Sequence, residues 1–391
     1  MRQGIFRSWV EINKSALVYN FGTFREFTHK LLLMAVVKSN AYGHGLVECA
    51  KLFVKSGCDW LGVDDIDEAI ALRKAEIKKP ILVFGYTLPS RYREASSAEV
   101  SLTIGSLDAL REIKKQSLRD KVTFTKSKLR IHLKLDTGLN RQGISEELLA
   151  ASCQVLEKLK DVILLEGVYS HFAAAELVRR KHYRDYCNKQ MDGFERMYNL
   201  VLSSLVPNTY NLVPIRHMAG TAATFLLPRS RYDLVRVGIG LYGMDPTSKS
   251  NLPFVKKLKL KPVLSWHSLI AQVKNVKKDE YVGYNLTEKL IRNSKLAIVP
   301  VGYWHGYPRS ASSRGEVIVS GKRCKVIGRI SMDMMTIDVT DVPKVKAGDK
   351  VVLIGKQDKE NLSAEEVAVK AETINYELVT SINPLLPRCY I

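Results

Sequence analysis

The chain has 391 residues, 46% of them hydrophobic and 26% charged, so it is long enough for two domains and too apolar to be disordered. The sequence contains no run of about 18 apolar residues, the length needed to cross a membrane, and the first ten residues lack an apolar stretch of signal-peptide length. The six cysteines show no C-x-x-C spacing, which argues against a disulfide framework and against a zinc cluster. We therefore expect a soluble, cytoplasmic protein with reduced thiols, no metal site and no membrane partner.

The formal net charge of +20 raises the possibility of nucleic-acid binding, because lysines that neutralise phosphates release counterions. The densest basic run lies at 256–261, where lysines alternate with leucines from Lys257 onward. Such alternation is typical of the solvent face of a strand. We predict a solvated basic surface and no nucleic-acid partner, with nucleic-acid binding as the alternative.

From Trp9 to about Leu241, short apolar runs alternate with amphipathic stretches. The predicted strands are Leu32–Val37, Trp60–Val63, Ile81–Phe84, Ser101–Ile104, Ile131–Leu135, Leu164–Ser170, Asn211–His217 and Leu234–Ile239. The predicted helices include Leu46–Val54, Ile66–Glu76, Leu107–Lys115 and Glu146–Lys158. Parallel strands need helical crossovers, and closure removes exposed edges, so the pattern predicts an α/β fold with a (β/α)8 barrel. A doubly wound open sheet is the alternative, but no G-x-G-x-x-G follows the first strand.

The first predicted strand passes through Lys38 into the small residues at 39–45. A continuously apolar run is typical of a parallel strand that is buried on both faces, so its carboxyl end is where a site is expected. A partly desolvated lysine there suits Schiff-base chemistry. Gly43 and Gly45 permit a tight turn with close backbone approach, and the helix that begins near Leu46 could direct free amides at an anion. A lysine that merely ends a strand is the alternative.

After about Pro246 the sequence changes to alternating apolar residues and turn signals. Candidate strands are Val317–Gly321, Cys324–Gly328, Met335–Val339 and Ala347–Ile354, with one helix over Ala364–Thr373. We predict a mainly antiparallel β domain over residues 246–391 and a barrel domain over residues 1–245. The first ten or so residues are able to pack with the β domain.

The stretch Ala35-Val-Val-Lys38-Ser-Asn-Ala-Tyr42-Gly43-His44-Gly45 resembles the cofactor attachment motif of the alanine racemase family. Further motifs that resemble the family's follow in order from Trp9 to Arg388. The resemblance implies that Lys38 carries pyridoxal 5'-phosphate and that the chain interconverts L- and D-alanine, supplying D-alanine for peptidoglycan. It also implies a head-to-tail homodimer with two shared active sites.

Residues near the last predicted barrel strands suit the cofactor. A phosphate group is often bound there by amides and hydroxyls, and the candidates are Tyr42, His217, Thr221, Gly238 and Ile239. By the resemblance, Arg236 lies at the pyridine nitrogen. An arginine cannot give up a proton, so that nitrogen stays neutral and the ring is a weaker electron sink, which favours proton removal and return at Cα.

Racemisation requires two bases on opposite faces of Cα. Lys38 serves one face, and the segment Tyr281-Val-Gly-Tyr284-Asn resembles the family's segment for the second base. The resemblance makes Tyr284 that base, contributed by the other subunit. A phenol needs neighbours that favour its ionised form, and His171 resembles the family's partner for it. Tyr303 follows at the family's spacing.

The resemblance implies that Arg141 binds the substrate carboxylate, to which its guanidinium can donate two parallel hydrogen bonds. Lys134 matches a position that is often carbamylated in the family, which would hold Arg141. The segment that contains Met332 and Asp333 resembles the loop that reaches the site from the partner chain.

Three positions differ from the usual family pattern. Gly220-Thr221 replaces the commonest Asn-Ser, so a hydroxyl is kept and an amide is lost. Pro384 stands where the family usually has a tyrosine, from which we expect a lost phosphate donor and a wider mouth. The alternatives are therefore a racemase of broader specificity, for example for serine, and a non-catalytic cofactor-binding homeostasis protein. Proteins of the latter kind lack the β domain and its tyrosine.

Overall fold

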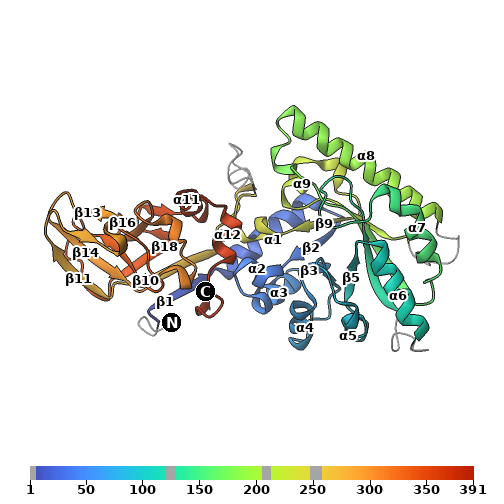
Figure 1. Ribbon diagram of the computed structural model, residues 1–391, viewed down its shortest axis with the longest axis horizontal. Coiled ribbons are helices and arrows are strands. Elements are labelled where there is room, and N and C mark those ends of the chain that lie inside the picture. The colour runs from blue at the N-terminus through green and yellow to red at the C-terminus, as the bar shows by residue number, and fades with distance from the viewer. Residues whose placement is uncertain (1–5, 120–127, 205–212, 247–257) are drawn as a thin grey trace.

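The computed structural model describes residues 6–119, 128–204, 213–246 and 258–391. The chain forms two halves along its long axis, an α/β half on the right of Figure 1 and a β-rich half on the left. The amino-terminal strand and the carboxyl terminus both lie toward the β-rich half (Figure 1). The chain therefore starts in one half, builds the other, and returns.

Eight parallel strands build the α/β half, in the order β8-β7-β6-β5-β4-β3-β2-β9. They are β2 (Leu32–Val36), β3 (Trp60–Val63), β4 (Ile81–Val83), β5 (Ser101–Ile104), β6 (Leu129–Lys134), β7 (Ile163–Tyr169), β8 (Ile215–His217) and β9 (Leu234–Val237). The sheet curls until its two end strands meet. The Asp233 amide donates to the Arg216 carbonyl at 3.1 Å, and the Arg236 amide donates to the Ala219 carbonyl at 3.0 Å. The predicted barrel is confirmed.

Helices surround this ring (Figure 1). They are α1 (Lys14–Thr28), α3 (Leu46–Lys55), α4 (Ile66–Lys74), α5 (Tyr92–Ser97), α6 (Leu107–Arg119), α7 (Glu146–Glu157), α8 (Lys181–Ser204) and α9 (Thr221–Leu226), while the segment labelled α2 (Lys38–Tyr42) is a left-handed turn. The four predicted helices are confirmed as α3, α4, α6 and α7. Local capping explains some starts, since the Asp65 side chain accepts a hydrogen bond from the Glu68 amide at the start of α4.

Apolar side chains fill one end of the ring. Met34, Trp60, Leu82 and Leu234 form a separate buried cluster, and Trp60 and Leu234 are the first residues of their strands. This packing closes the amino end of the barrel. The carboxyl ends of the strands are therefore where an open site can lie.

The β-rich half is a mainly antiparallel sheet in the order β11-β14-β17-β16-β15-β18-β10-β1-β20, with β19 paired to β18. Its strands are β1 (Ser8–Ile12), β10 (Leu264–Leu269), β11 (Gln272–Val276), β14 (Ser294–Val299), β15 (Glu316–Val319), β16 (Lys322–Ile327), β17 (Met335–Asp338), β18 (Lys350–Gln357), β19 (Glu360–Leu362) and β20 (Arg388–Tyr390). A small hairpin joins β12 (Tyr281–Val282) to β13 (Glu288–Lys289). Val10 lies opposite Trp266, so the first strand belongs to this sheet.

Three local predictions differ from the structure. The strand expected over Asn211–His217 is shorter: 211 and 212 lie outside the described residues, and β8 starts only after Pro214, which has no amide to donate. The basic run is not a strand where it is described, because Lys259 has φ of 52° and interrupts an extended path; 256 and 257 lie outside the described residues.

The expected helix over Ala364–Thr373 ends earlier, and a second helix follows it. The two are α11 (Ala364–Lys370) and α12 (Asn375–Thr380). All six cysteines are described and each is a free thiol, as predicted. Within the described ranges, no helix is both long and apolar enough to cross a membrane.

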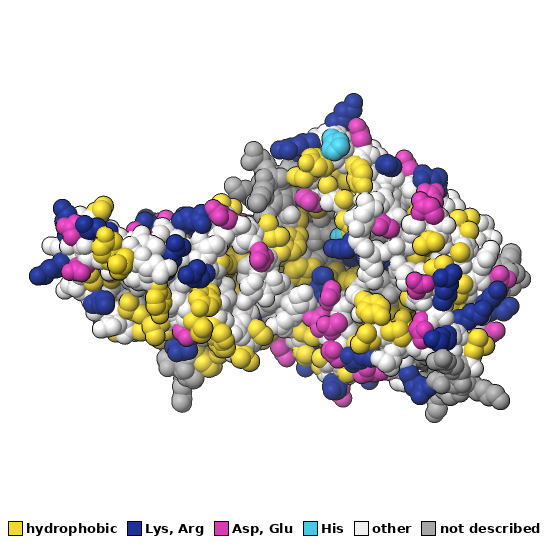
Figure 2. Space-filling view, in the orientation of Figure 1, with side chains coloured by type: hydrophobic (Ala, Val, Ile, Leu, Met, Phe, Trp, Pro, Cys, Tyr) yellow, Lys and Arg dark blue, Asp and Glu magenta, His cyan; other side chains and the backbone are white. Residues whose placement is uncertain are grey.

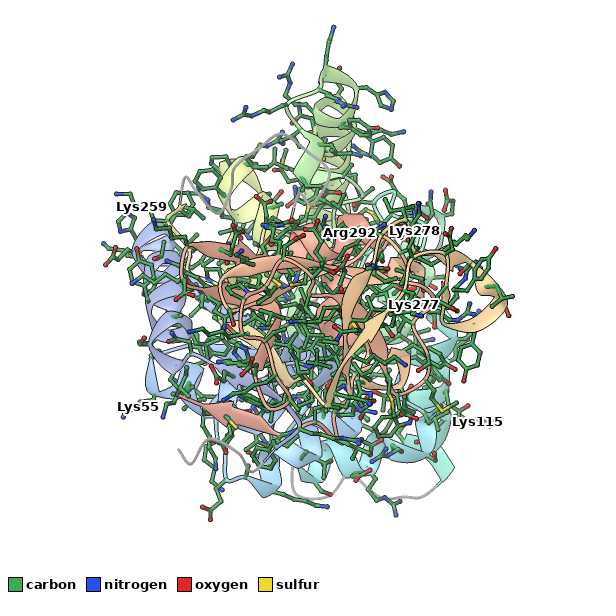
Figure 3. The ribbon with its side chains drawn as sticks, turned by 90° about the vertical axis from the view of Figure 1, so that its left-hand side faces the viewer. Lys55, Lys115, Lys259, Lys277, Lys278 and Arg292 are labelled. Carbon is green, nitrogen blue, oxygen red and sulfur yellow. The ribbon has the colours of Figure 1, made fainter. Side chains whose placement is uncertain are left out.

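The excess positive charge is distributed over the molecule. In Figure 3, Lys55 and Lys259 lie at one side of the outline and Lys115 at the other, whereas Lys277, Lys278 and Arg292 belong to the β-rich half. These six cations do not form one patch. Arg292 is already paired with Asp341 at 2.8 Å.

Candidate active site

A cavity of about 590 Å³ lies at the carboxyl ends of the barrel strands. Figure 2 shows the molecule hollowed at its centre, with basic side chains among apolar ones. The predicted site residues that line the cavity are Lys38, Tyr42, Lys134, Arg141, His171, Thr221, Arg236, Gly238 and Ile239. These residues lie at the ends of five different strands, β2, β6, β7, β8 and β9, and meet at one opening, as the barrel fold requires of an active site.

Lys38 stands at the start of a left-handed turn. Ser39, Asn40, Ala41 and Tyr42 have φ between 52° and 55°, a region that costs L-residues roughly 1–2 kcal/mol each. Hydrogen bonds hold the turn: the Asn40 amide donates to Glu68 at 2.9 Å, and the Asn40 side chain accepts from the Leu46 amide at 2.9 Å. Neighbouring groups therefore impose the position of Lys38.

The lysine amine has an acidic neighbour. Lys38 Nζ donates to Asp64 Oδ1 at 3.0 Å, from the loop that follows β3. Asp64 and Glu68 were not predicted as site residues, since nothing in a sequence shows which strand ends are adjacent. The order of strands in the sheet places β3 beside β2 and so brings these carboxylates to Lys38.

The glycines after Lys38 have φ of 80° at Gly43 and 103° at Gly45, as expected for a tight turn. Their close approach is to the carboxyl-terminal segment. A Cβ on Gly43 would lie 2.1 Å from the Val379 carbonyl oxygen, and one on Gly45 would lie 1.9 Å from the Tyr390 hydroxyl oxygen. At the start of α3, where free amides were expected to face an anion, the Leu46 amide donates to the Asn40 side chain, and no residue of α3 lines the cavity.

One end of the cavity gathers hydroxyl and amide groups. The Gly238 amide donates to Thr221 Oγ1 at 2.9 Å, and Ile239 follows at the start of a short 3-10 turn. A Cβ on Gly238 would lie 2.3 Å from the Tyr42 hydroxyl oxygen, so only glycine admits that phenol. Burial raises the pKa of Tyr42, which keeps it a protonated donor.

Arg236 is buried and held on several sides. Nη1 donates to His217 Nδ1 at 2.7 Å, while Nη2 donates to the Ser170 and Met218 carbonyls at 2.8 and 2.9 Å. Nη2 also lies 3.2 Å from His171 Nδ1. Burial lowers the pKa of Arg236 to about 10, so it remains a cation at neutral pH.

The histidines around Arg236 are neutral. Burial, with the charge of Arg236 adding to it, lowers the pKa of His132 and His171 to about 3 and holds that of His217 well below its ordinary value. His217 does not line the cavity; it lies behind Arg236 and contacts His132 at 2.8 Å through Nε2. A neutral ring can accept from the guanidinium, whereas a charged ring would repel it.

Lys134, at the end of β6, and Arg141, in the loop that follows, also line the cavity. Lys134 is buried, and its amine is 3.5 Å from Gln142 Oε1. Burial, followed by the charges of Arg141 and Arg236, lowers the pKa of Lys134 to about 8. Arg141 is exposed at the cavity edge, where its guanidinium can meet an anion from solution.

Four predicted residues lie elsewhere in the chain. Tyr284, Tyr303, Met332 and Asp333 do not line the cavity and are exposed on the β-rich half. They share one region: the Tyr303 amide donates to the Ser331 carbonyl at 3.1 Å, next to Met332. A single chain does not bring Tyr284 to Lys38.

Two family descriptions together match most of the chain. The family description "Alanine racemase, N-terminal domain" matches residues 12–246, and "Alanine racemase, C-terminal domain" matches residues 263–390. This chain belongs to the alanine racemase family.

Individual members of the family are similar along nearly their full length. Alanine racemase 1 of Caldanaerobacter subterraneus subsp. tengcongensis is 36% identical, over 99% of this chain and 95% of that protein. The crystal structure of alanine racemase from Streptomyces lavendulae has a TM-score of 0.88 at 34% identity, covering 98% and 97% of the two chains. The Bartonella henselae structure, described as holding covalently bound pyridoxal phosphate, has a TM-score of 0.84 at 28% identity, covering 99% and 100%.

Alanine racemases depend on pyridoxal 5'-phosphate, and the cavity has the groups that this cofactor needs. It offers a primary amine at Lys38, a buried cation at Arg236, and hydroxyl and amide donors near Thr221 and Gly238. The glycine at 238 leaves space beside the Tyr42 phenol that a side chain would fill. The residues present therefore fit the cofactor.

The expected loss of a phosphate donor at Pro384 finds no support in the cavity of this racemase. Pro384 is exposed and does not line the cavity. Tyr376, on α12, does line it, and its ring lies 6.1 Å from that of Tyr42. Tyr376 was not predicted as a site residue, because α12 was not predicted and its contact with the Lys38 turn is made only by folding.

Gly220, the other departure, also has a steric role. A Cβ at this position would lie 3.3 Å from His171 Cε1, which is tighter than nine in ten Cβ contacts. The small residue therefore gives His171 its room beside Arg236.

Proposed function

We propose that this chain is a pyridoxal-phosphate-dependent alanine racemase that carries its cofactor on Lys38 and interconverts L- and D-alanine. The product D-alanine would supply cell-wall peptidoglycan, the usual role of the family. The observation that carries the proposal is a single cavity that joins a strand-end lysine to a buried arginine among neutral histidines. A cytoplasmic location and the domain division 1–245 and 246–391 remain proposals.

The cofactor would be held at three points. Lys38 would bind its aldehyde carbon, Arg236 would donate to its ring nitrogen, and the phosphate would be bound by Tyr42, Thr221, Gly238 and Ile239. His217 holds Arg236 from behind. Bound pyridoxal phosphate supplies an aldehyde that condenses with an amine and a ring that makes the Cα proton removable.

Arg236 restricts the outcome of the reaction. Its guanidinium stays charged and gives up no proton, so it holds the ring nitrogen in the neutral form. His171 and His217 accept from it and remain neutral, which prevents them from supplying a proton in its place. The proton that leaves Cα is therefore returned to Cα.

Arg141 would bind the substrate carboxylate through its guanidinium fork. Lys134 would orient Arg141 if it is carbamylated, because the product is an anion beside a cation. Its lowered pKa of about 8 supports this, since carbon dioxide adds to the neutral amine. Met332 and Asp333 would approach from the partner subunit.

Two residues would move the Cα proton. When the substrate amine takes its place, the free amine of Lys38 accepts or returns the proton on one face of Cα. The phenol of Tyr284 of the partner subunit does so on the other face, with His171 as its neighbour and Tyr303 beside the mouth. Proton transfer by a positioned group contributes typically 10²–10⁴-fold in rate, so both are essential.

We infer a homodimer from this assignment, because Tyr284 does not line the cavity of its own chain. The β-rich half also exposes large apolar side chains around Tyr284 and Met332. They are Tyr281, Tyr284, Leu286, Tyr303, Trp304, Met332 and Met334, between 42% and 66% exposed. An exposed apolar patch of this kind is typical of a protein interface.

A visible absorption spectrum tests the function first. We expect a yellow protein whose band disappears on treatment with borohydride, with the reduced cofactor mapped to the peptide that contains Lys38. Lys38→Ala should abolish the label and activity. Lys51→Ala, an exposed lysine on α3, should keep both. A label on any other lysine would contradict the proposal.

Complementation tests the shared site. A dimer of one Lys38→Ala chain and one Tyr284→Phe chain contains one intact site if the two residues come from different subunits. Random pairing of equal amounts should restore about one quarter of the activity. No recovery would mean that each site uses the two residues of one chain.

A racemase of broader specificity was motivated by Pro384. Because Pro384 lies outside the cavity and Tyr376 lines it, no feature of the cavity favours this alternative. Alanine is the proposed substrate.

A further inference from the structure

Four exposed cations lie together where α8 begins. Arg179 and Arg180 precede the helix, and Lys181 and Arg184 belong to its first turn. Figure 2 shows basic side chains over the upper end of this helix, above the hollow at the centre of the molecule. We call these four residues the cationic rim.

The backbone joins the cationic rim to the wall of the cavity. The short 3-10 turn Ala175–Leu177 lines the cavity. The Arg180 amide donates to the Leu177 carbonyl at 3.0 Å, and the Arg184 amide donates to the Arg180 carbonyl at 3.1 Å. This segment follows β7, so the rim lies at the same end of the barrel as the cavity.

Neighbouring carboxylates do not neutralise the rim. Within the described ranges, no carboxylate forms an ion pair with any of its four residues, whereas further along α8 both Asp192 and Glu195 pair with Arg229. Residues 175–189 hold five lysine and arginine residues and two acidic residues. The stretch beside the cavity therefore keeps a net positive charge.

The stability of α8 does not explain the rim. The amino end of a helix carries a partial positive charge, so acidic residues are favourable there and cations are unfavourable. The first turn of α4 follows this rule with Asp67 and Glu68. The first turn of α8 has no acidic residue and carries Lys181 and Arg184 instead. The reason for these cations therefore lies outside the helix.

The positive charge continues into the cavity. Lys38, Lys134, Arg141 and Arg236 line it, and Glu176 is the one acidic residue among the described residues that do so. A cleft with walls of one sign of charge concentrates ions of the opposite sign. The phosphate of the cofactor carries about −1.5 to −2 charges at neutral pH, whereas alanine is a zwitterion without net charge. The field of the rim therefore acts on the cofactor and not on the substrate.

We propose that the cationic rim attracts the phosphate-bearing cofactor from solution and raises the rate at which it enters the cavity. The inference rests on the proposed function, which makes pyridoxal phosphate the ligand. The rim residues do not line the cavity, so they should change the association rate and leave the dissociation rate unchanged. Salt should weaken the effect, because the Debye length falls from about 30 Å at 0.01 M to about 3 Å at 1 M.

The test follows the binding of pyridoxal phosphate to cofactor-free, full-length protein by stopped-flow absorbance. The rim variant combines Arg179→Gln, Arg180→Gln, Lys181→Gln and Arg184→Gln. Its second-order association rate should fall about tenfold at an ionic strength of about 0.01 M, and by less than about twofold at about 1 M. Its dissociation rate should equal that of the wild type.

The matched control removes four exposed cations from the other end of the barrel. It combines Lys51→Gln, Lys55→Gln, Lys74→Gln and Lys78→Gln, on α3, on α4 and before β4. The net charge changes by the same amount as in the rim variant, but the cavity lies at the opposite end of the strands. The control should bind the cofactor at the wild-type rate at both ionic strengths.

Turnover separates attraction from damage to the site. Once loaded with cofactor, the rim variant should keep the wild-type kcat and KM for alanine, because alanine has no net charge. A structural role for the rim would instead change turnover, and would lower the association rate equally at low and high salt. Either result would overturn the proposal.

Two failures are distinguishable. If the wild-type protein takes up no pyridoxal phosphate on Lys38 at either ionic strength, the proposed function is wrong. If the wild type takes it up and the rim variant associates as fast as the control, the role of the rim is overturned and the function stands. A thermal unfolding midpoint for each variant shows that the compared proteins are folded.

Discussion

Arg236 and His217 are joined by a hydrogen bond of 2.7 Å in which the guanidinium Nη1 donates to Nδ1 of the imidazole. An arginine only donates, so His217 carries its proton on Nε2. That nitrogen then donates to Nδ1 of His132 at 2.8 Å. A chain of neutral rings therefore fixes the arginine proposed to meet the cofactor.

His132, the last imidazole in this series of hydrogen bonds, should contribute to the stability of the fold. His132→Leu leaves the buried Nε2–H of His217 without an acceptor, and we expect a loss of roughly 1–3 kcal/mol in the free energy of unfolding. His132→Asn offers an amide oxygen in its place and should lose less. Urea unfolding at neutral pH measures both. Equal losses would show that His132 does not act as the acceptor.

Tyr284 should be needed for chemistry and not for folding. Its side chain is 66% exposed, so Tyr284→Phe should change the free energy of unfolding by less than about 0.5 kcal/mol. Racemisation should fall by about 10²–10⁴-fold. Because the two enantiomers have equal free energy in solution, kcat/KM must fall by the same factor in both directions. Tyr281→Phe, 49% exposed on the same hairpin, is the control and should remain active.

Lys134 should bind carbon dioxide in a pH-dependent way. Its pKa is lowered to about 8, so the reactive neutral amine predominates above that pH and the unreactive ammonium below it. Addition gives a carbamate and releases one proton. With labelled bicarbonate we expect a ¹³C carbamate resonance at alkaline pH that disappears on acidification.

Lys134→Arg should lack this resonance, whereas Lys128→Arg, exposed just before β6, should keep it. A resonance that survives Lys134→Arg would place the carbamate on another lysine. Loss of the carbamate on Lys134 should raise KM for alanine more than it lowers kcat, because Lys134 acts through Arg141.

Tyr376 and Pro384 should differ in their effect on the site. Tyr376→Phe removes a hydroxyl from the cavity wall and should weaken cofactor retention by about five- to tenfold, which corresponds to about 1 kcal/mol. Pro384→Tyr, on an exposed turn, should leave the relative turnover of L-alanine, L-serine and L-lysine unchanged. A shift toward alanine in Pro384→Tyr would revive the broader-specificity alternative.

Local pattern alone determined much of this protein. The apolar run before Lys38 predicted a strand buried on both faces, and β2 is buried from Leu33 to Val36, because continuous hydrophobicity is a property of neighbours in sequence. The family motif around Lys38 is also a contiguous stretch of sequence, so the position of the site could be predicted without the fold. The four predicted helices were likewise found from local periodicity, and α4 begins at the predicted Ile66.

Only the tertiary structure decided which residues meet. Lys38 contacts Asp64, 26 positions away, because β2 and β3 are adjacent in the ring. His132 meets His217 across 85 positions, and Tyr376 reaches Tyr42 from the other end of the chain. Such contacts depend on strand order and on the packing of α12, and neither is written in any local pattern. The chemistry of the site could therefore be predicted from the sequence, whereas the neighbours of its central residues could be identified only in the folded structure.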